Sequence, residues 1–423
     1  MKLTYMAAAC LCVAATSGAQ AAEPAAPAPA TLADAVRQGQ SMSSLRLRDE
    51  WVEQDGKTEQ ANALTLRTLL GWQTAPLQGF SVGAQFINVG VFDNDYDNGD
   101  KGTMQPGRAA YPRIVDPDYT GVNQLYVDWT GLPATRLRLG RQSVKLDNVR
   151  FVGNVEFRQV MQVFDGVSIE NQSLLPKTTL FAAHFNQVTQ VSTLRQDTHI
   201  NLVNARHALS PTENLIGYGY FVGWERDSLQ ASSSRTLGAR LDGARPLSPD
   251  WKLLYTAEYA KQAPYRDGAA SIDSHYARLG AGAQYGSWYA RVDREVLSSN
   301  RGQSAFQTPL GTNHLFQGWV DKFLVTPNAG IRDTFVTAGG KIGALTLQTE
   351  YHWIDSDVRF ASGAGTGARY GTEWDLSVAY AVRKDLIGKV EYGMFREKDP
   401  YTVTATSRVR DTDKLWVTML YTF

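Results

Sequence analysis

Charged residues recur at every second position in many short segments of this 423-residue chain. Arg46 and Arg48 stand two residues apart, and so do Arg136 and Arg138. A β-strand sends alternate side chains to opposite faces, so this spacing gathers the charges on one face. Guanidinium groups bind carboxylates through two parallel hydrogen bonds, and charged side chains around a pore set the sign of the ions that pass. The candidates for lining or narrowing such a pore are Arg46, Arg48, Arg67, Asp128, Arg136, Arg138, Arg141, Arg150, Arg158, Arg240, Arg278, Arg291, Glu350 and Asp375.

The opposite face of the same segments is apolar and ends in aromatic residues. Leu347, Tyr351 and Trp353 share one parity, while Glu350 and His352 share the other. A lysine or arginine on the lipid-facing side of a membrane barrel costs about 2–4 kcal/mol at the middle of the bilayer. The apolar face is therefore expected to meet lipid, and the charged face is expected to line water.

Segments of this kind follow one another to the C-terminus, and their connections alternate between short and long. The short connections often contain proline, and the longest polar ones are 92–120 and about 297–330. Short periplasmic turns and long extracellular loops are typical of transmembrane barrels, and an even strand number leaves both termini in the periplasm. The sequence predicts an all-β protein, a single transmembrane antiparallel β-barrel of about 18 strands with short periplasmic turns and long extracellular loops. The expected strands are 43–53, 61–73, 79–91, 121–130, 134–144, 163–171, 177–187, 199–208, 213–224, 234–245, 250–262, 273–285, 287–296, 331–341, 344–354, 370–382, 386–396 and 413–423.

The first residues have the pattern of a secretory signal. Lys2 precedes an apolar run at 3–15, and the small residues at 19–21 suit a signal peptidase, so we expect cleavage after residue 21. The apolar run is shorter than the roughly 20 residues that a membrane-spanning helix needs. Both cysteines, Cys10 and Cys12, lie in this signal, so the mature chain is expected to have no disulfide and no thiolate metal site. The predicted organisation is a signal peptide at 1–21, a periplasmic Ala/Pro-rich segment at 22–42 and the barrel at 43–423.

The last strand carries an apolar face up to Phe423. An open apolar edge invites aggregation in a soluble protein, whereas a closed barrel pairs it with the first strand, here that of Leu45 and Leu47. The ending resembles the signal that the barrel assembly machinery of the outer membrane reads. A soluble β-sandwich is the alternative, but its inner parity would be less polar. The residues expected to meet lipid are Leu415, Val417, Met419, Tyr421 and Phe423, and those expected in the lumen are Lys414, Trp416, Thr418 and Thr422.

One stretch, 139–167, departs from plain alternation and carries three short motifs. In order, they are Gly140-Arg141-Gln142, Arg150-Phe151-Val152-Gly153 and Phe164-Asp165-Gly166. The stretch resembles the alginate export family of outer-membrane barrels. The resemblance implies an 18-stranded barrel with an arginine-lined constriction built partly by inward-folded loops. Family members usually carry Gly-Asp shortly before the arginine, whereas Asp147-Asn148 stands here, so the acidic partner of Arg150 is displaced or absent.

The arginines of this stretch have two open interpretations. Arg141, Arg150 and Arg158 either grip carboxylates of a solute or set the selectivity of a pore. Alternatively, they pair with acidic residues of the same stretch and hold the loop against the wall. The acidic residues in question are Asp147, Glu156 and Asp165.

Other patterns in the chain point to little further chemistry. Asp93, Asp95 and Asp97 fit the first positions of a calcium loop, but Asn98 and Met104 replace the glycine and glutamate that a helix-loop-helix site requires. A looser calcium site on an external loop and a solvated acidic loop are the two interpretations. The six histidines show no helical metal spacing, and neither a Gly-x-Ser-x-Gly elbow nor a phosphate loop is present. The sequence predicts no enzyme and no cofactor beyond this calcium ion.

The balance of charge completes the functional prediction. Lys plus Arg and Asp plus Glu number 42 each, so no basic excess points to nucleic acid. We expect a porin-like channel in the outer membrane of a Gram-negative bacterium, passing hydrophilic, anionic or carbohydrate solutes by diffusion. Export of an acidic exopolysaccharide such as alginate is the alternative, and an outer-membrane hydrolase is a further one. The expected partners are membrane lipid and lipopolysaccharide, a small hydrophilic or polyuronate solute, and the barrel assembly machinery, with the chain as a monomer.

Overall fold

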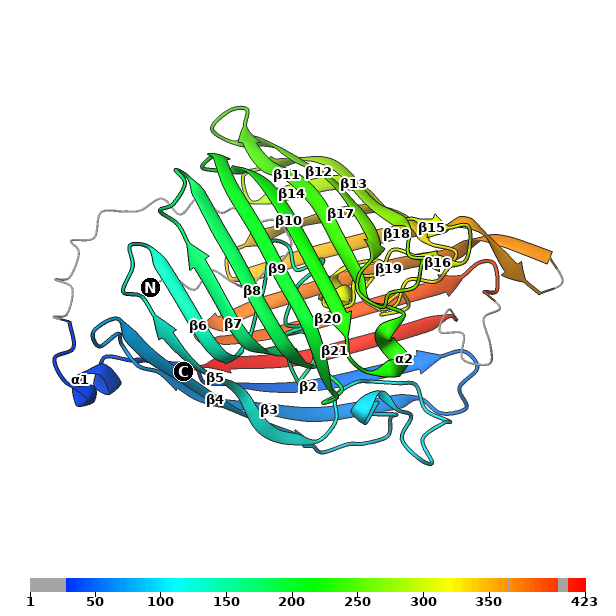
Figure 1. Ribbon diagram of the computed structural model, residues 1–423. Helices are drawn as coiled ribbons and strands as arrows, with labels where there is room; N and C mark the ends of the chain where they lie inside the picture. Colours follow the sequence, from blue (N-terminus) through cyan, green and yellow to red (C-terminus); the bar gives the residue numbers. More distant parts are fainter. Residues whose placement is uncertain (1–27, 364, 402–409) are drawn as a thin grey trace.

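Consecutive strands of the chain pair with one another, and the last strand pairs with the first long one, which closes a barrel (Figure 1). The computed structural model describes residues 28–363, 365–401 and 410–423, so the signal peptide expected at 1–21 lies outside the described residues. Within this part of the chain, nineteen strands share one sheet. The two-residue β1 pairs only with β3, so eighteen strands form the wall, as the sequence predicted.

The first half of the wall consists of β2 (Ser44–Gln54), β3 (Ala61–Gln73), β4 (Phe80–Val91), β5 (Tyr119–Trp129), β6 (Thr135–Gln142), β7 (Val163–Asn171), β8 (Thr178–Thr189), β9 (Arg195–Ser210) and β10 (Glu213–Trp224). The second half consists of β11 (Ser234–Pro246), β12 (Trp251–Pro264), β13 (Ser274–Tyr285), β14 (Trp288–Leu297), β17 (Ile331–Ile342), β18 (Leu345–Ser362), β19 (Gly365–Arg383), β20 (Leu386–Glu397) and β21 (Thr412–Thr422). The short elements are α1 (Leu32–Arg37), β1 (Gln40–Ser41), η1 (Asp100–Gly102), α2 (Asp227–Gln230), β15 (Ser299–Asn300), β16 (Ser304–Ala305) and η2 (Asn313–Leu315).

The expected strands agree with this wall, and the differences lie mainly at the ends away from the short turns. β18 and β19 continue to Ser362 and from Gly365, well past the predicted borders at 354 and 370. Their extension is polar, with Asp355 and Asp357 in sequence, so it lacks the apolar alternation that marks a membrane-facing strand. β6 is shorter than predicted, because the chain leaves the wall after Gln142.

The closing strand behaves as the sequence predicted. Met419 lies opposite Leu47 and Tyr421 lies opposite Leu45 in the pairing of β21 with β2. Val417 and Met419 are 44% and 48% exposed on the outer surface, whereas Lys414 and Trp416 point inward and are almost fully buried. The Phe423 N–H donates to the Ser43 carbonyl at 3.2 Å, so the terminal residue is bound to the first strand.

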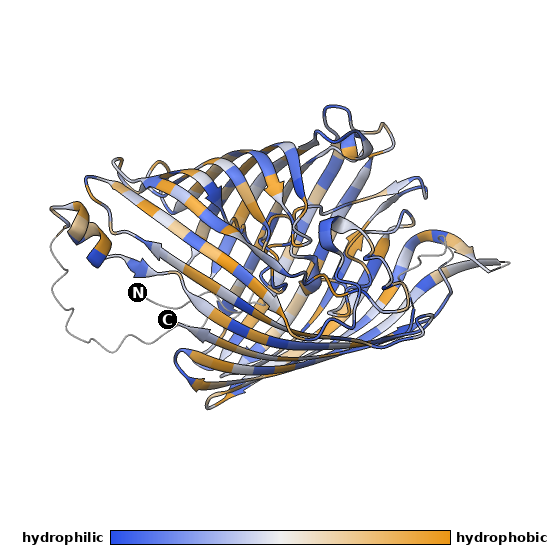
Figure 2. Ribbon diagram, turned by 90° about the horizontal axis from the view of Figure 1, so that it is seen from below, coloured by the Kyte–Doolittle hydropathy of each residue, from blue (hydrophilic) through white to orange (hydrophobic). Residues whose placement is uncertain are grey.

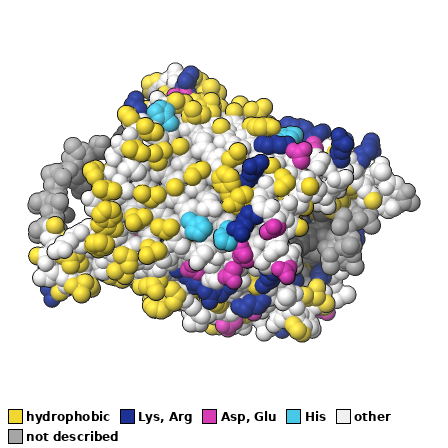
Figure 3. All heavy atoms as spheres, viewed as in Figure 1, with side chains coloured by type: hydrophobic (Ala, Val, Ile, Leu, Met, Phe, Trp, Pro, Cys, Tyr) yellow, Lys and Arg dark blue, Asp and Glu magenta, His cyan; other side chains and the backbone are white. Residues whose placement is uncertain are grey.

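The outer surface carries the apolar parity of the strands. Figure 2 shows apolar and polar residues alternating along them, and in Figure 3 hydrophobic side chains cover most of the visible face toward the end that holds the short turns. Charged side chains gather mainly toward the opposite end of this face. Such an apolar band between polar ends matches the hydrocarbon layer of a bilayer. None of the described helices is long and apolar enough to cross a membrane.

Two connections fold into the barrel rather than away from it. Residues 143–162 join β6 to β7, and residues 298–330 join β14 to β17. Val152 and Leu310, one from each connection, form a parallel bridge, and the Gly153 N–H donates to the Leu310 carbonyl at 2.9 Å. Their apolar side chains share one buried cluster with inward residues of the wall, including Phe164 and Tyr276. The hydrophobic core therefore lies inside the barrel, in agreement with the inward-folded loops that the family resemblance implied.

Helix α1 lies at the end of the barrel that holds the short turns (Figure 1). Thr31 and Asp34 cap it reciprocally, since each side chain accepts a hydrogen bond from the backbone N–H of the other. The Trp72 indole N–H donates to the Val36 carbonyl at 2.9 Å and ties the helix to β3.

Candidate lumen constriction

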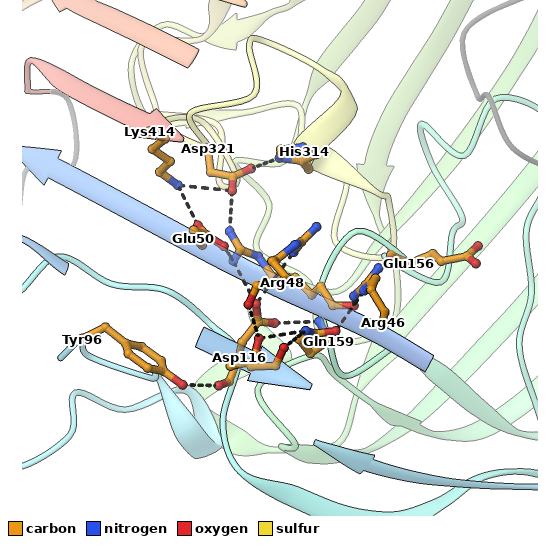
Figure 4. Close-up of polar contacts among 12 residues, drawn as sticks. Arg46, Arg48, Glu50, Tyr96, Asp116, Glu156, Gln159, His314, Asp321 and Lys414 are labelled. Carbon is orange, nitrogen blue, oxygen red and sulfur yellow. Dashed lines mark hydrogen bonds and ion pairs between the residues drawn. The ribbon is translucent and has the colours of Figure 1, made fainter. Parts of the chain in front are cut away.

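A network of buried charges forms where the inward segments meet the wall (Figure 4). Arg158 of segment 143–162 is its centre. One guanidinium nitrogen lies 2.9 Å from Glu50 on β2 and 3.6 Å from Asp116 of the connection 92–118, and another lies 2.7 Å from Asp321 of segment 298–330. Lys414 on β21 lies 3.5 Å from Asp321 and 3.8 Å from Glu50. The network joins three connections to the first and last strands.

The protonation of this network follows from its burial and its cations. Burial alone would raise the pKa of Asp321, but His314, Lys414 and Arg158 together hold this pKa well below its usual value. Burial raises the pKa of Asp116 despite the nearby arginines. Asp321 is therefore the ionised carboxylate of this network, and it binds both Arg158 and Lys414.

Three arginines of β2 and β3 face the interior, and Arg46 holds the backbone of segment 143–162. Arg46 donates to the Gln159 side-chain oxygen at 2.9 Å and to the Glu156 carbonyl at 2.7 Å. Arg48 lies 3.8 Å from Asp116. Arg67 faces Arg46 across the strand pair. We call Arg46, Arg48 and Arg67 the arginine wall; all three were predicted to face inward, and all three are buried inside the barrel.

One part of this region stays in contact with water. Lys145 and Glu156 form an ion pair whose side chains are 39% and 49% exposed, although both belong to a segment inside the barrel. The Arg67 guanidinium is buried, yet its Nε and Nη1 have no hydrogen-bond partner among the described residues. The Arg67 guanidinium therefore faces the interior with donors that no described protein group satisfies.

The acidic partner of Arg150 lies far away in the sequence. Its Nε donates to the Glu295 carboxylate of β14 at 2.9 Å, and its other nitrogens donate to Gln317 at 3.0 Å and Asn313 at 3.3 Å. Glu295 of the barrel wall is therefore the acidic partner of Arg150, which was expected to be displaced or absent. Arg150 is fully buried, so it pins segment 143–162 to segment 298–330 and does not line the pore.

The remaining inward arginines pair with carboxylates of the wall. Arg138 donates to both oxygens of Asp128 at 2.6 and 2.7 Å, across the pair of β5 and β6. Arg278 and Arg291 both bind Asp293, at 3.1 and 2.6 Å. Two further pairs are Arg240 with Asp242 at 3.3 Å, and Arg136 with Glu170 at 3.3 Å near the short turns.

The position of Arg141 corrects the sequence prediction. It lies opposite Leu125 and has the parity of Leu139, and these leucines are 53% and 62% exposed on the outer surface. Its guanidinium binds both oxygens of Asp165, at 2.8 and 2.7 Å, beside the strand end that is far from the short turns. Arg141 therefore faces outward, and its pairing with Asp165 was one of the two interpretations of this stretch.

The carboxylates of β17, β18 and β19 form a second charged surface inside the barrel. Asp333, Glu350, Glu373 and Asp375 are all buried and surround His352. We call these four residues the carboxylate wall. Alternation in the sequence predicts only the face of these residues, because no local spacing indicates that β18 and β19 bring Glu350 and Asp375 into register.

A turn of segment 298–330 sits on the carboxylate wall. The Val320 N–H donates to Glu373 at 2.6 Å, and the Trp319 N–H donates to Asp375 at 3.3 Å. Gly318 has a φ of 84°, and an added Cβ would lie 2.2 Å from the carboxyl carbon of Glu373. A side chain at this position would be strained by the backbone conformation and would push against the Glu373 carboxylate.

The expected calcium loop is organised by protein donors. Arg108 binds Asp95 at 3.2 Å and Arg113 binds Asp97 at 2.7 Å. Asp93 accepts from the Asp95 N–H and from the Asn62 side chain. Calcium binding at this loop stays a prediction.

The closed wall, the apolar belt and the inward segments define a transmembrane β-barrel whose lumen is narrowed by its own connections. A family model described as alginate export matches residues 66–293, more than half of the chain. The chain belongs to the alginate export family of outer-membrane β-barrels. The matched region includes the three motifs at 139–167 and strands β4–β13.

Several crystal structures share the fold over nearly their whole length. OpdL of Pseudomonas aeruginosa is 14% identical, with a TM-score of 0.68 over 92% of this chain and 99% of that chain. OccAB2 of Acinetobacter baumannii is 13% identical, with a TM-score of 0.69 over the same shares. The outer membrane protein opdK of Pseudomonas aeruginosa is 16% identical, with a TM-score of 0.65 over 90% and 98%. No curated protein sequence matches the chain.

Proposed function

We propose that the protein is a passive outer-membrane channel for small hydrophilic solutes and that it prefers anionic ones, including acidic carbohydrates. The arginine wall carries this proposal. Three guanidinium groups face the interior on neighbouring strands, next to the segment that narrows it, and Arg67 has nitrogens without a protein partner among the described residues. A guanidinium group offers a planar set of donors that matches a carboxylate.

The filling of the barrel supports a small solute. An eighteen-stranded barrel without inward segments is wide enough for an aqueous channel. Here segments 143–162 and 298–330 occupy much of the interior with apolar side chains that pack against the wall. Water reaches the Lys145–Glu156 pair at the edge of this filling. A narrow, charged passage favours small solutes that can exchange part of their hydration for contacts with the wall.

One similar structure supports the chemical class of the solute. OpdK of Pseudomonas aeruginosa, 15% identical with a TM-score of 0.64, has a structure with vanillate. Vanillate is a small aromatic carboxylate. A carboxylate is also what the arginine wall of this chain is suited to bind.

Ion selectivity in a planar lipid bilayer tests the proposal. We expect a reversal potential of the sign that marks anion preference under a potassium chloride gradient. Galacturonate added on one side should reduce the chloride current by competing for the arginine wall, while uncharged galactose at the same concentration should leave it unchanged. A clear cation preference, or equal effects of the two sugars, contradicts the proposal.

Export of an acidic exopolysaccharide is the second candidate, and membership in the alginate export family favours it. A polymer would need to pass the same arginine wall in an extended conformation. Alginate oligomers of increasing length distinguish the two functions. A channel for small solutes should be blocked for longer times as the oligomer grows, whereas an exporter should pass the long oligomers from the periplasmic to the external compartment.

We further propose that the barrel acts as a monomer and without chemical turnover. Its wall is closed by the pairing of β2 with β21, so neither of these strands has an unpaired edge that could bind a strand of a second subunit. Light scattering of the purified protein in detergent should give the mass of one chain. A channel should conduct without hydrolysing lipid or peptide substrates, and measurable hydrolysis would favour the outer-membrane hydrolase instead.

A further inference from the structure

Three acidic or imidazole side chains converge on one point of the inner wall. Glu350 and His352 project from β18 and Asp375 projects from β19, and one ligand atom of each lies within 4.8 Å of the others. Glu350 and Asp375 are directly opposite in the strand register. All three residues are buried. The calcium loop expected from the sequence lies elsewhere, in the connection 92–118.

Both ring nitrogens of His352 face carboxylates. Its Nδ1 lies 2.8 Å from Asp333. Its Nε2 lies 3.3 Å from Glu350 and 3.8 Å from Asp375. Because Asp333 holds Nδ1, Nε2 is the nitrogen that can bind a metal ion together with Glu350 and Asp375.

The distances suit a metal ion. Zinc binds imidazole nitrogen and carboxylate oxygen at about 2.0–2.2 Å, which places two ligands of a tetrahedral site about 3.4 Å apart. The separations of Nε2 from the Glu350 and Asp375 oxygens lie close to this value.

Each of the three side chains is also held by a neighbouring group. Asp333 fixes the ring of His352, in the arrangement that orients metal-bound histidines in proteins. Gln348 donates to the second oxygen of Glu350 at 2.9 Å, and the Trp319 N–H donates to Asp375 at 3.3 Å. Phe335 stacks on the imidazole with ring centroids 4.9 Å apart. Such outer contacts fix the rotamers that a ligand set requires.

We propose that Glu350, His352 and Asp375 bind a divalent first-row metal ion such as Zn²⁺ on the inner wall of the barrel. Two carboxylates and one imidazole leave further positions for water or for a solute carboxylate. The Glu350 side chain keeps 10% exposure, so the ion has its entrance on the Glu350 side. The ion offsets the charge of the carboxylate wall.

Isothermal titration of the untagged, full-length mature protein with Zn²⁺ in detergent tests this site. We expect one ion per chain, with binding lost in His352→Gln and weakened at least tenfold in Glu350→Gln. Asp333→Asn, which removes the contact to Nδ1, should weaken binding 10- to 100-fold, the usual effect of such outer partners. His184→Gln is the matched control, because this histidine lies on the exposed outer face and should leave binding unchanged.

Two further measurements separate a loss of metal binding from a loss of folding. The heat-dependent mobility of the barrel in gel electrophoresis shows whether each variant has folded. If His352→Gln fails to fold, Co²⁺ bound to the wild-type protein should give the visible absorption of a nitrogen and oxygen ligand set, and Glu350→Gln should need at least tenfold more Co²⁺ to reach the same absorption. Absence of Zn²⁺ binding by the wild-type protein, or equal binding by His352→Gln and His184→Gln, overturns the proposal.

Discussion

The arginine wall and the carboxylate wall hold the two inward segments by opposite ends of the peptide group. Arg46 on the arginine wall donates to backbone carbonyls of segment 143–162. Glu373 and Asp375 on the carboxylate wall accept from backbone N–H groups of segment 298–330. Because every peptide group offers both a donor and an acceptor, either sign of charge can anchor a loop. The interior is therefore positively charged at β2 and β3 and negatively charged at β17–β19. Strands β20 and β21 lie between the two walls.

The largest effect in this comparison should come from removing Arg158, which joins the two segments. Arg158→Ala leaves Glu50, Asp116 and Asp321 buried with fewer cations. Loss of one partner from a buried ion pair costs about 3–5 kcal/mol. We expect this loss in the free energy of unfolding, measured by urea denaturation in lipid vesicles with tryptophan fluorescence.

The exposed pair near the short turns supplies the control for Arg158. Arg136 is half exposed, and Glu170 is its one ion-pair partner among the residues that the structure describes. Surface ion pairs contribute about 0–1 kcal/mol, so Arg136→Ala should have little effect on the same measurement. Equal losses in the two variants would show that the network around Arg158 does not hold the segments.

A smaller effect is expected at the turn that sits on the carboxylate wall. Gly318→Ala forces a side chain into a left-handed conformation and against Glu373. Strain of this kind costs about 1–3 kcal/mol. The turn should move away from the wall, which we expect to appear as larger current fluctuations in single-channel recordings.

Gly343→Ala is the control for Gly318→Ala, because Gly343 has a similar φ of 58° but nothing lies within 4 Å of an added Cβ. If the two variants give the same recordings, close packing against Glu373 is unimportant.

The smallest effects should be paired and opposite in sign. Arg67→Gln removes a positive charge from one side of the lumen, and Glu373→Gln removes a negative charge from the other. We expect the permeability ratio of chloride to potassium to fall in the first and rise in the second. Each change should be about twofold to fivefold, which corresponds to about 0.4–1 kcal/mol of electrostatic energy. Shifts of the same sign would contradict the separation of the two walls.

Alternation of polarity was sufficient to predict the wall, because lipid and water impose opposite demands on neighbouring residues. It assigned strands and faces correctly, including the closing pair of β2 and β21. The outward position of Arg141 was also readable from parity, since it shares the parity of Leu139, but the family motif had drawn it to the lumen.

The contacts inside the barrel could not be predicted in the same way. The parity of a residue in a strand shows which face of the wall it lies on. It shows neither the position of the residue along the barrel axis nor the side chain that it contacts. Arg150 meets Glu295 across 145 positions of sequence, and no local pattern relates the two. The meeting of Glu350, His352 and Asp375 depends in the same way on the register between β18 and β19, which is set by the whole closed sheet.

The network of Glu50, Lys414, Asp321 and Arg158 lies across the line where the first and last strands meet. Glu50 is on β2 and Lys414 is on β21, so these charges come together only after the circle of strands is complete. A barrel that is still open at this line has Glu50 and Lys414 on separate edges. The contact of Glu50 with Lys414 therefore requires a closed barrel, and it holds the first and last strands together from the inside.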